Sequence, residues 1–155
     1  MEVTVEYMIL IPVLILQIFL FPMFANVVMN HWVDEQKTLG LQQDASYLSS
    51  SIEQVYLSLN HTSILSCTIT STLNSNPMIN GYYYKANGSL QAVSGSSKIL
   101  HLTISLIGQD LTASTSVTLG QNVQWAASTF MSNSTSACVT AQKLPNQTIM
   151  LSFGT

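Results

Sequence analysis

The sequence predicts an α+β fold in which a long, bent, hydrophobic N-terminal helix is followed by an antiparallel, sandwich-like β domain. Residues 7–33 carry no formal charge, and nearly every residue as far as Met29 is apolar. From Ile64 onward, apolar residues alternate with Ser and Thr, which is the period of a strand with one buried and one solvated face. We therefore expect a helix over residues 1–60 and a β-rich head over residues 61–155.

The first half of the helix, residues 1–30, is long enough to cross a membrane. A span of about 23 residues at ~1.5 Å per residue covers the ~30 Å hydrocarbon core of a bilayer. Pro12 and Pro22 lie inside it. Because proline lacks an N–H and clashes with the preceding turn, we expect a bend or a locally melted turn at each. Gln17 is polar among apolar neighbours. We expect its amide to form a hydrogen bond either with a neighbouring helix or with the backbone of its own helix.

The second half of the helix, residues 31–60, is amphipathic. Apolar residues recur at alternating spacings of four and three, so they form one narrow seam with polar residues between them. The seam requires an apolar partner, and the following β domain is expected to supply it. Gly40 is the expected weak point between the two halves. The seam consists of Leu41, Ala45, Leu48, Ile52, Val55 and Leu59.

The β domain is expected to have six or seven strands. Residues 107–110, Ile-Gly-Gln-Asp, join two of the clearest runs as a hairpin. Loops are expected at residues 74–77, 87–89 and 94–97, where Asn, Gly, Ser and Pro cluster. Residues 121–131 fit either a short helix or an edge strand. The predicted strands cover residues 64–73, 81–86, 100–106, 111–119, 135–141 and 148–153.

Tyr82, Tyr83 and Tyr84 form an aromatic run in the second of these strands. Because side chains alternate between the two faces of a strand, we expect one ring to pack in the core and two to stay partly exposed. Exposed aromatic rings of this kind bind sugars or other protein surfaces.

The composition excludes several functions. Charged residues make up 7% of the chain and the net charge is −3, so there is no basic surface for nucleic acid. The sequence has no glycine-rich phosphate loop and no serine in a nucleophile-elbow context. His31, His61 and His101 are scattered without the spacing of metal ligands. We therefore expect no enzymatic activity, no metal and no cofactor.

Cys67 and Cys138 are the two cysteines of the chain and lie far apart in the β domain. An even number of cysteines without a C-x-x-C motif favours a disulfide in an exported protein, and two buried free thiols are the alternative. A bridge that closes so long a loop would contribute about 4 kcal/mol to the stability of the domain.

Four sites match the acceptor pattern for N-glycosylation, and all four follow the apolar helix segment. Surface glycans on an exported domain would supply the hydration that the scarce charges do not. The predicted glycosylation sites are Asn60, Asn87, Asn133 and Asn146.

Residues 2–30 resemble the N-terminal segment of the type IV pilin superfamily in its archaeal form. Glu6 stands directly before the apolar run and matches the family's recurrent glutamate, and Pro22 matches a proline that the family places well into the helix. Archaellins, the subunits of the related rotary filament, usually begin with Gly- and Ala-rich segments, whereas this chain has neither residue before Ala25. An adhesive pilus is therefore preferred to an archaellum.

The resemblance implies a structural protein that polymerises with copies of itself. In this family a basic leader is removed by a dedicated peptidase, and because no Lys or Arg precedes Lys37, we expect the chain to be the mature form. The apolar helix of such a subunit waits in the membrane until the pilus assembly machinery packs it into the filament core. The head domains then form an extracellular sheath that attaches to surface or glycan ligands.

Glu6 is the residue to which the resemblance gives a specific role. An ionised carboxylate at the edge of an apolar helix is costly unless it is paired. The family implies a pair with the N-terminal amine of a neighbouring subunit, and the alternative is a solvated carboxylate at the depth of the lipid headgroups. Pro12, Gln17 and Pro22 are the other expected assembly positions.

Two other interpretations of the whole chain stay open. The first is a single-pass membrane anchor that carries an extracellular β-domain binding module, because a plain anchor has the same apolar composition as a filament helix. The second is a subunit of an archaellum.

Overall fold

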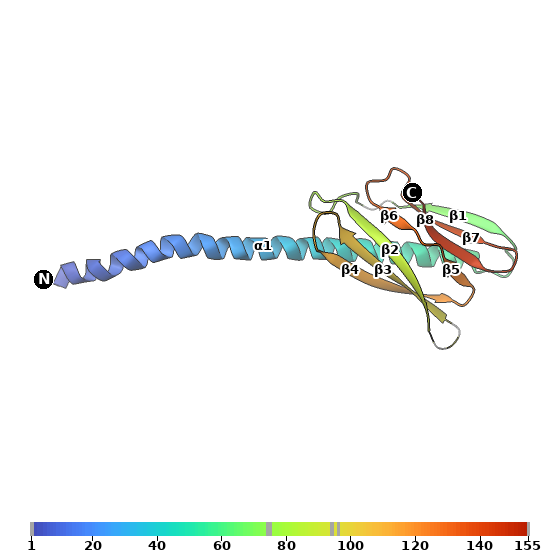
Figure 1. The fold of residues 1–155 in the computed structure, drawn as a ribbon, viewed down its shortest axis with the longest axis horizontal. Helices are drawn as coiled ribbons and strands as arrows, with labels where there is room; N and C mark the ends of the chain where they lie inside the picture. Colours follow the sequence, from blue (N-terminus) through green and yellow to red (C-terminus); the bar gives the residue numbers. More distant parts are fainter. Residues whose placement is uncertain (1, 74–75, 94, 96, 155) are drawn as a thin grey trace. The chain divides into compact units, whose positions relative to one another are not determined.

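The computed structural model confirms the predicted α+β class with a long, apolar N-terminal helix (Figure 1). Over the described part of the chain, one helix, α1 (Glu2–Leu59), precedes eight strands. The chain forms two compact units, Met1–Gln36 and Lys37–Thr155. The structure describes residues 2–73, 76–93, 95 and 97–154, with the side chains of the helix described from residue 7 onward.

Helix α1 runs without interruption through Pro12, Pro22 and Gly40. The locally melted turns expected at the two prolines are therefore not formed in the described helix. Each proline removes a single N–H donor, and the hydrogen bonds of its neighbours maintain the helical path. The blue part of the ribbon curves gently, as long helices usually do, and a distinct bend at either proline stays a prediction (Figure 1). The helix ends at Leu59, after which the Asn60 N–H still donates to the Tyr56 carbonyl at 2.9 Å.

The strands form two four-stranded sheets, which we call the β1 sheet, with the order β1-β7-β8-β5, and the β4 sheet, with the order β4-β3-β2-β6. All neighbouring strands are antiparallel, as predicted, except β5 and β8, which run parallel. The bounds of the strands are β1 (Cys67–Thr72), β2 (Tyr84–Ala92), β3 (Ser97–Leu106), β4 (Thr112–Gly120), β5 (Val123–Trp125), β6 (Thr129–Met131), β7 (Cys138–Lys143) and β8 (Ile149–Gly154).

Residues 121–131 form two short strands, whereas their sequence pattern fitted either a short helix or one edge strand. Strand β5 lies at the edge of the β1 sheet, and strand β6 lies at the edge of the β4 sheet. This segment therefore carries the chain from one sheet to the other. Its ambiguous pattern reflects two three-residue strands that serve different sheets.

Residues 87–89 were predicted to form a loop, and this prediction is wrong. They lie in the middle of β2 and pair with residues 101–103 of β3. Gly88 is needed there because a Cβ would lie 2.6 Å from Cζ2 of Trp125, so this glycine marks a close approach and not a turn. The β3–β4 hairpin, by contrast, is confirmed, and its turn contains Gly108 with a φ of 84°.

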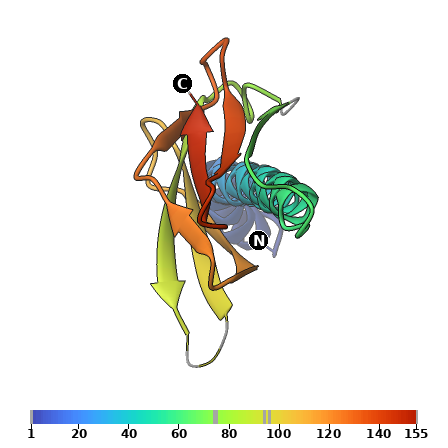
Figure 2. The same cartoon turned by 90° about the vertical axis from the view of Figure 1, so that its right-hand side faces the viewer.

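The apolar seam of α1 is buried in the second unit, as the spacing predicts. Its side chains belong to one core cluster with the inward-facing side chains of both sheets. Figure 2 shows the teal part of the helix beside the strands. Each buried Leu or Ile contributes ~1.5–3 kcal/mol, so the sheets hold this half of the helix firmly. The exposed fractions are Leu41 0%, Ala45 1%, Leu48 0%, Ile52 0%, Val55 5% and Leu59 0%, and Tyr56 joins them at 7%.

A chain of aromatic rings joins the two sheets. Trp125 meets Phe153 edge-to-face with ring centroids 5.1 Å apart. Phe153 contacts Phe130 at 5.7 Å, and Phe130 contacts Tyr84 at 6.0 Å. Trp125 and Phe153 belong to the β1 sheet, whereas Phe130 and Tyr84 belong to the β4 sheet. Because such aromatic pairs stabilise beyond their buried area, this chain of rings fixes the sheets against each other.

Candidate assembly surface

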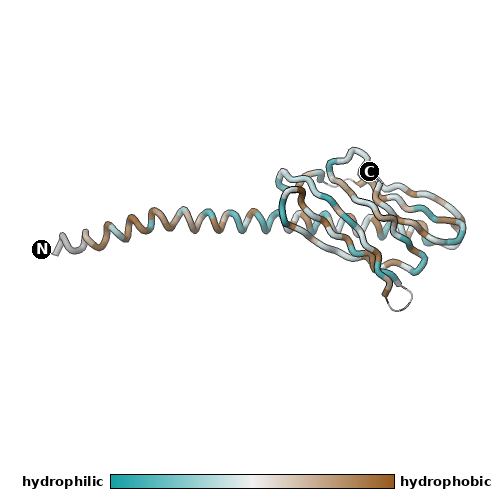
Figure 3. Tube along the Cα trace, in the orientation of Figure 1, coloured by the Kyte–Doolittle hydropathy of each residue, from teal (hydrophilic) through white to brown (hydrophobic). Residues whose placement is uncertain are grey.

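The helix from Tyr7 to Met29 presents a continuous apolar surface. Eighteen large apolar side chains in this stretch are 39–79% exposed. Figure 3 shows the corresponding brown bands along the N-terminal part of the trace. By length and composition the helix can cross a membrane. A continuous exposed apolar surface of this kind marks contact with lipid or with other protein chains.

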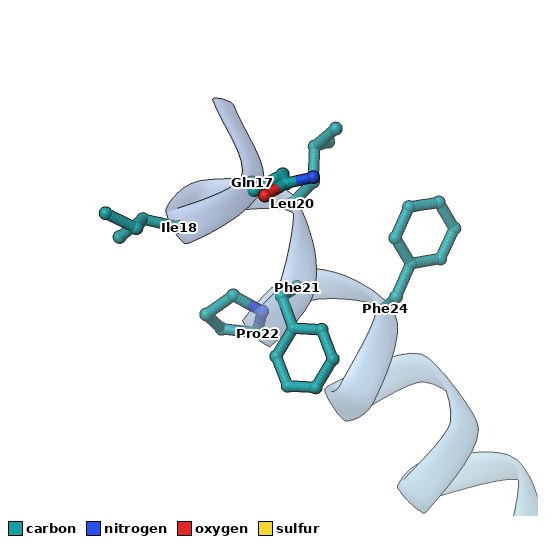
Figure 4. A pocket seen from close by; sticks show the side chains of 6 residues that line it. All are labelled: Gln17, Ile18, Leu20, Phe21, Pro22 and Phe24. Atoms are coloured by element: carbon teal, nitrogen blue, oxygen red, sulfur yellow. The ribbon is translucent and has the colours of Figure 1, made fainter. Parts of the chain in front are cut away.

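Pro12 and Pro22 introduce polar backbone groups into this surface. Because proline has no N–H, the carbonyl oxygens of Met8 and Ile18 lack their usual helical donor. The helix surface is hollowed beside Pro22, and the amide of Gln17 is the polar side chain at this hollow (Figure 4). A hollow of this kind can receive a side chain from a helix packed alongside. Its lining residues are Gln17, Ile18, Leu20, Phe21, Pro22 and Phe24.

The two ends of the apolar stretch carry the charged groups. The backbone of Glu6 lies in α1, but its side chain lies outside the described residues, so its expected pair with an N-terminal amine stays a prediction. At the other end, Nε2 of His31 lies 3.2 Å from Oε1 of Glu35, with both side chains more than half exposed. An exposed pair of this kind contributes little to stability.

Lys37 fastens the start of the second unit's helix to the β3–β4 hairpin. Its Nζ donates to Oε1 of Gln109 at 2.8 Å and lies 5.1 Å from the centre of the Tyr82 ring. Gly40 lies one turn further along, where a Cβ would be 2.7 Å from Cγ2 of Ile79. Gly40 is therefore a point of close packing in a continuous helix, and its weakness relative to the rest of the helix stays a prediction.

Two further lysines are anchored on backbone carbonyls. Nζ of Lys143 donates to the carbonyl of His61 at 2.7 Å, and Nζ of Lys98 donates to the carbonyl of Val123 at 2.7 Å. Lys143 is 2% exposed and places a cation just beyond the C-terminus of α1, where it complements the helix dipole. Lys85 alone among the lysines has an exposed side chain. Sequence patterns did not single out these anchors, and the scarcity of lysine was the only available signal.

Asp44 lies on α1, where its carboxyl is hydrogen-bonded to Tyr84, the first residue of β2. Burial raises the pKa of the Asp44 carboxyl above its ordinary value, and a hydrogen bond from the Tyr84 hydroxyl opposes part of that rise. The folded head therefore favours the neutral form of this carboxyl more than the unfolded chain does.

The tyrosine run has the predicted arrangement. Tyr84 is 0% exposed, whereas Tyr82 and Tyr83 are 37% and 38% exposed. The Tyr83 carbonyl accepts a hydrogen bond from the Ile107 N–H at 2.8 Å, which ties this run to the β3–β4 hairpin. Tyr82 and Tyr83 precede β2, which begins at Tyr84, so only the last ring of the run lies in a strand as predicted. The two partly exposed rings lie on the surface of the head.

The predicted Cys67–Cys138 disulfide is wrong, because both cysteines are free thiols. The register of β1 and β7 pairs Cys67 with Lys143 and Cys138 with Thr72, so the cysteines stand at opposite ends of the ladder. Five residues at ~3.3 Å each separate them by ~16 Å. A disulfide requires Cα atoms within about 7 Å. The alternative of two buried thiols is also wrong, because Cys67 is exposed.

The four predicted glycosylation sites are exposed, and their modification stays a prediction. Oδ1 of Asn87 accepts a hydrogen bond from the Thr129 hydroxyl at 2.8 Å, and Oδ1 of Asn146 accepts one from the Thr148 N–H at 3.1 Å. The sites lie at the end of α1, within β2, after β6 and in the β7–β8 turn, at Asn60, Asn87, Asn133 and Asn146.

The described residues contain no group of three or more His, Cys, Asp or Glu side chains placed to hold a metal ion. No protein-family model, no curated protein and no solved structure matches this chain.

Proposed function

We propose that this chain is the structural subunit of an extracellular type IV pilus-like filament that attaches cells to surfaces. The observation that carries the proposal is the contrast between the two halves of α1. The seam of the second half is buried in the head, whereas the eighteen large apolar side chains between Tyr7 and Met29 are exposed. Other molecules must cover this first half.

Water cannot be the final environment of this surface. At ~1.5–3 kcal/mol for each large apolar side chain, its partial exposure costs on the order of 20 kcal/mol. That cost exceeds the net stability of a typical domain, ~5–15 kcal/mol. The bilayer covers the helix before assembly, and the helices of neighbouring copies cover it in the filament.

Two features support packing among copies over a solitary anchor. The carbonyl oxygens freed by Pro12 and Pro22 are costly in lipid, and groups of a neighbouring helix can satisfy them. The amide of Gln17 at the hollow beside Pro22 is a group of the type that bonds across packed helices. Because each copy contacts the next through different surfaces, the assembly is an open helix.

In this proposal Glu6 sets the axial register by pairing with the N-terminal amine of the neighbouring copy. The heads form the outer layer, where Tyr82, Tyr83 and the glycans are available for adhesion. The partners are the membrane, the assembly machinery, the leader peptidase and the surface ligand.

Electron microscopy of material sheared from the cell exterior, with mass spectrometry of the same fraction, tests the proposal. We expect thin helical filaments composed of this chain. Glu6→Ala should yield at least ~10-fold fewer filaments, which corresponds to an ion pair worth ~1.4 kcal/mol. Glu2→Ala, the same change four residues earlier, is the matched control and should assemble as the wild type does. Filaments that lack this chain would refute the proposal.

A membrane-anchored binding module is the second candidate, and the length of the apolar helix favours it. It predicts that detergent extracts the protein as a monomer or small oligomer. It also predicts that Glu6→Ala leaves export and binding unchanged, because a solitary anchor needs no register with a neighbour.

A further inference from the structure

Strand β4 is an unprotected edge. It ends the β4 sheet, and among the described strands it pairs with β3 alone. Its nine residues, TASTSVTLG, include no charge and no proline, and its register with β3 is continuous, without a bulge. Soluble proteins usually guard long edges with lysine, proline, bulges or short strands, because an open edge invites another strand.

The backbone groups that face this free edge follow from the hydrogen-bond alternation. The Leu106 N–H donates to the Leu111 carbonyl at 3.1 Å, which makes these two a hydrogen-bonded pair. Every second residue of β4 from Ala113 onward therefore forms its backbone hydrogen bonds with β3. The Gly120 N–H, which donates away from β3 to the Tyr56 hydroxyl at 3.2 Å, fits this alternation. The residues that direct N–H and C=O to the free edge are Thr112, Ser114, Ser116 and Thr118.

Strand β1 is a second edge of the same character. It ends the β1 sheet, and of the strands described it pairs only with β7. The Leu73 N–H donates to the Ala137 carbonyl at 3.4 Å, so the same alternation places Thr68, Thr70 and Thr72 at the free edge. The strand, CTITST, is also free of charge and proline.

These two edges fit each other better than they fit the remaining edges. Strands β5 and β6, the other two edges, have three residues each and give a much shorter ladder. The side chains at the free edges of β1 and β4 are exposed hydroxyls, and Thr and Ser side chains stabilise each other across strands. No like charges oppose the pairing.

A contact between β4 of one copy and β1 of the next would build an open polymer. Strands β1 and β4 belong to different sheets of one chain, so pairing them between copies leaves one free edge at each end. Such a heterologous contact propagates without limit, whereas pairing β4 with β4 would close after two copies.

We therefore propose that the free edge of β4 in one copy pairs with the free edge of β1 in a second copy of this chain. The pairing rests on the proposed function and deepens it, because it joins the heads of neighbouring subunits by main-chain hydrogen bonds. The apolar helices then form the core of the filament, and a sheet shared between heads forms its outer layer.

Amide hydrogen exchange of the wild-type chain tests this directly. The exchange of residues 68–72 and 112–118 is compared between filaments and the detergent-dispersed subunit. We expect at least ~10-fold slower exchange in filaments at the outward-facing amides of both strands. Equal exchange rates in filaments and in the detergent-dispersed subunit would overturn the pairing, and this comparison needs only the wild-type chain.

Ser116→Pro and Thr70→Pro test the same contact by removing one outward N–H each. Proline is tolerated at these positions because neither N–H bonds the subunit's own sheet. Ser116→Ala and Thr70→Ala, which keep the N–H, are the matched controls. We expect each proline variant to lose exchange protection on both strands and to form fewer filaments, with the alanine variants unchanged.

The outcomes separate this pairing from the proposed function. Wild-type filaments together with normal assembly of both proline variants would overturn the edge pairing alone. Disruption by Ser116→Pro but not by Thr70→Pro would overturn β1 as the partner strand. A wild-type chain that forms no filaments would overturn the proposed function and the pairing together.

Discussion

Gly88→Ala, a substitution at the contact between Gly88 and Trp125, tests how the two sheets are held together. A methyl group on Gly88 would lie 2.6 Å from Cζ2 and 2.7 Å from Cε2 of the indole. Carbon atoms in contact are normally ~3.5–4.0 Å apart. In Gly88→Ala, the indole must therefore shift or the two sheets must separate.

The cost of this substitution depends on how freely the indole can move. Its ring packs edge-to-face on Phe153 at 5.1 Å, and Phe153 in turn contacts Phe130. Overpacking of such a site costs ~1–3 kcal/mol. Alanine regains ~0.4–1 kcal/mol by restricting the unfolded chain, which leaves a net loss of about 1–2 kcal/mol. At about 4 °C per kcal/mol for a head of this size, the melting temperature should fall by about 4–8 °C.

Thermal unfolding of the full chain in detergent, followed by circular dichroism, measures this loss. Ser89→Ala, on the exposed face of the same strand, is the control and should change stability by less than ~0.5 kcal/mol. Trp125→Phe removes the clash together with a buried indole N–H that has no hydrogen-bond partner among the described residues. In that background Gly88→Ala should cost less than ~0.5 kcal/mol. If the two substitutions instead add independently, the steric explanation is refuted.

Three further predictions concern the head and its thiols. Asp44→Asn removes a carboxyl whose pKa is raised by burial in the folded head. The wild type should therefore lose stability relative to the variant as the pH rises from the ordinary Asp pKa of the unfolded chain to the higher pKa of the folded head. A difference in melting temperature that is the same at every pH would contradict this. Leu48→Ala should cost about 2–5 kcal/mol in denaturant unfolding, because Leu48 is 0% exposed. Leu39→Ala, at a position 58% exposed on the same helix, should stay within ~0.5 kcal/mol, and equal losses would argue against the seam. A reducing agent should leave the melting temperature unchanged while a maleimide labels Cys67 in the folded protein; a lower melting temperature on reduction would reveal a bridge.

The helix and the central strands could be predicted because their signals are local. The seam from Leu41 to Leu59 repeats at the helical period, and all six of its predicted residues are buried. Residues 100–106 of β3 and strand β4 alternate between more and less buried positions, and the hairpin glycine, Gly108, has the positive φ that its turn requires. The apolar stretch of the candidate assembly surface is equally local, because composition alone defines it.

The features that escaped prediction depend on distant segments. Residues 87–89 have the composition of a loop, and only the packing of Trp125 from the other sheet explains why Gly88 lies in a strand. A count of two cysteines favours a bridge, but the register of β1 against β7 decides their separation. The contact between Lys37 and Gln109 likewise requires the fold, since no sequence pattern joins them.

The placement of the lysines also bears on resistance to digestion. Trypsin-like proteases cut after Lys or Arg where the backbone opens locally. The chain has four lysines and no arginine. Lys37, Lys98 and Lys143 hold their ammonium groups on oxygen acceptors, and Lys85 lies in β2 between the paired strands β3 and β6. Lys37 lies in α1 and the other three lysines lie in paired strands, so the backbone at each lysine must open before these proteases can cut the folded head.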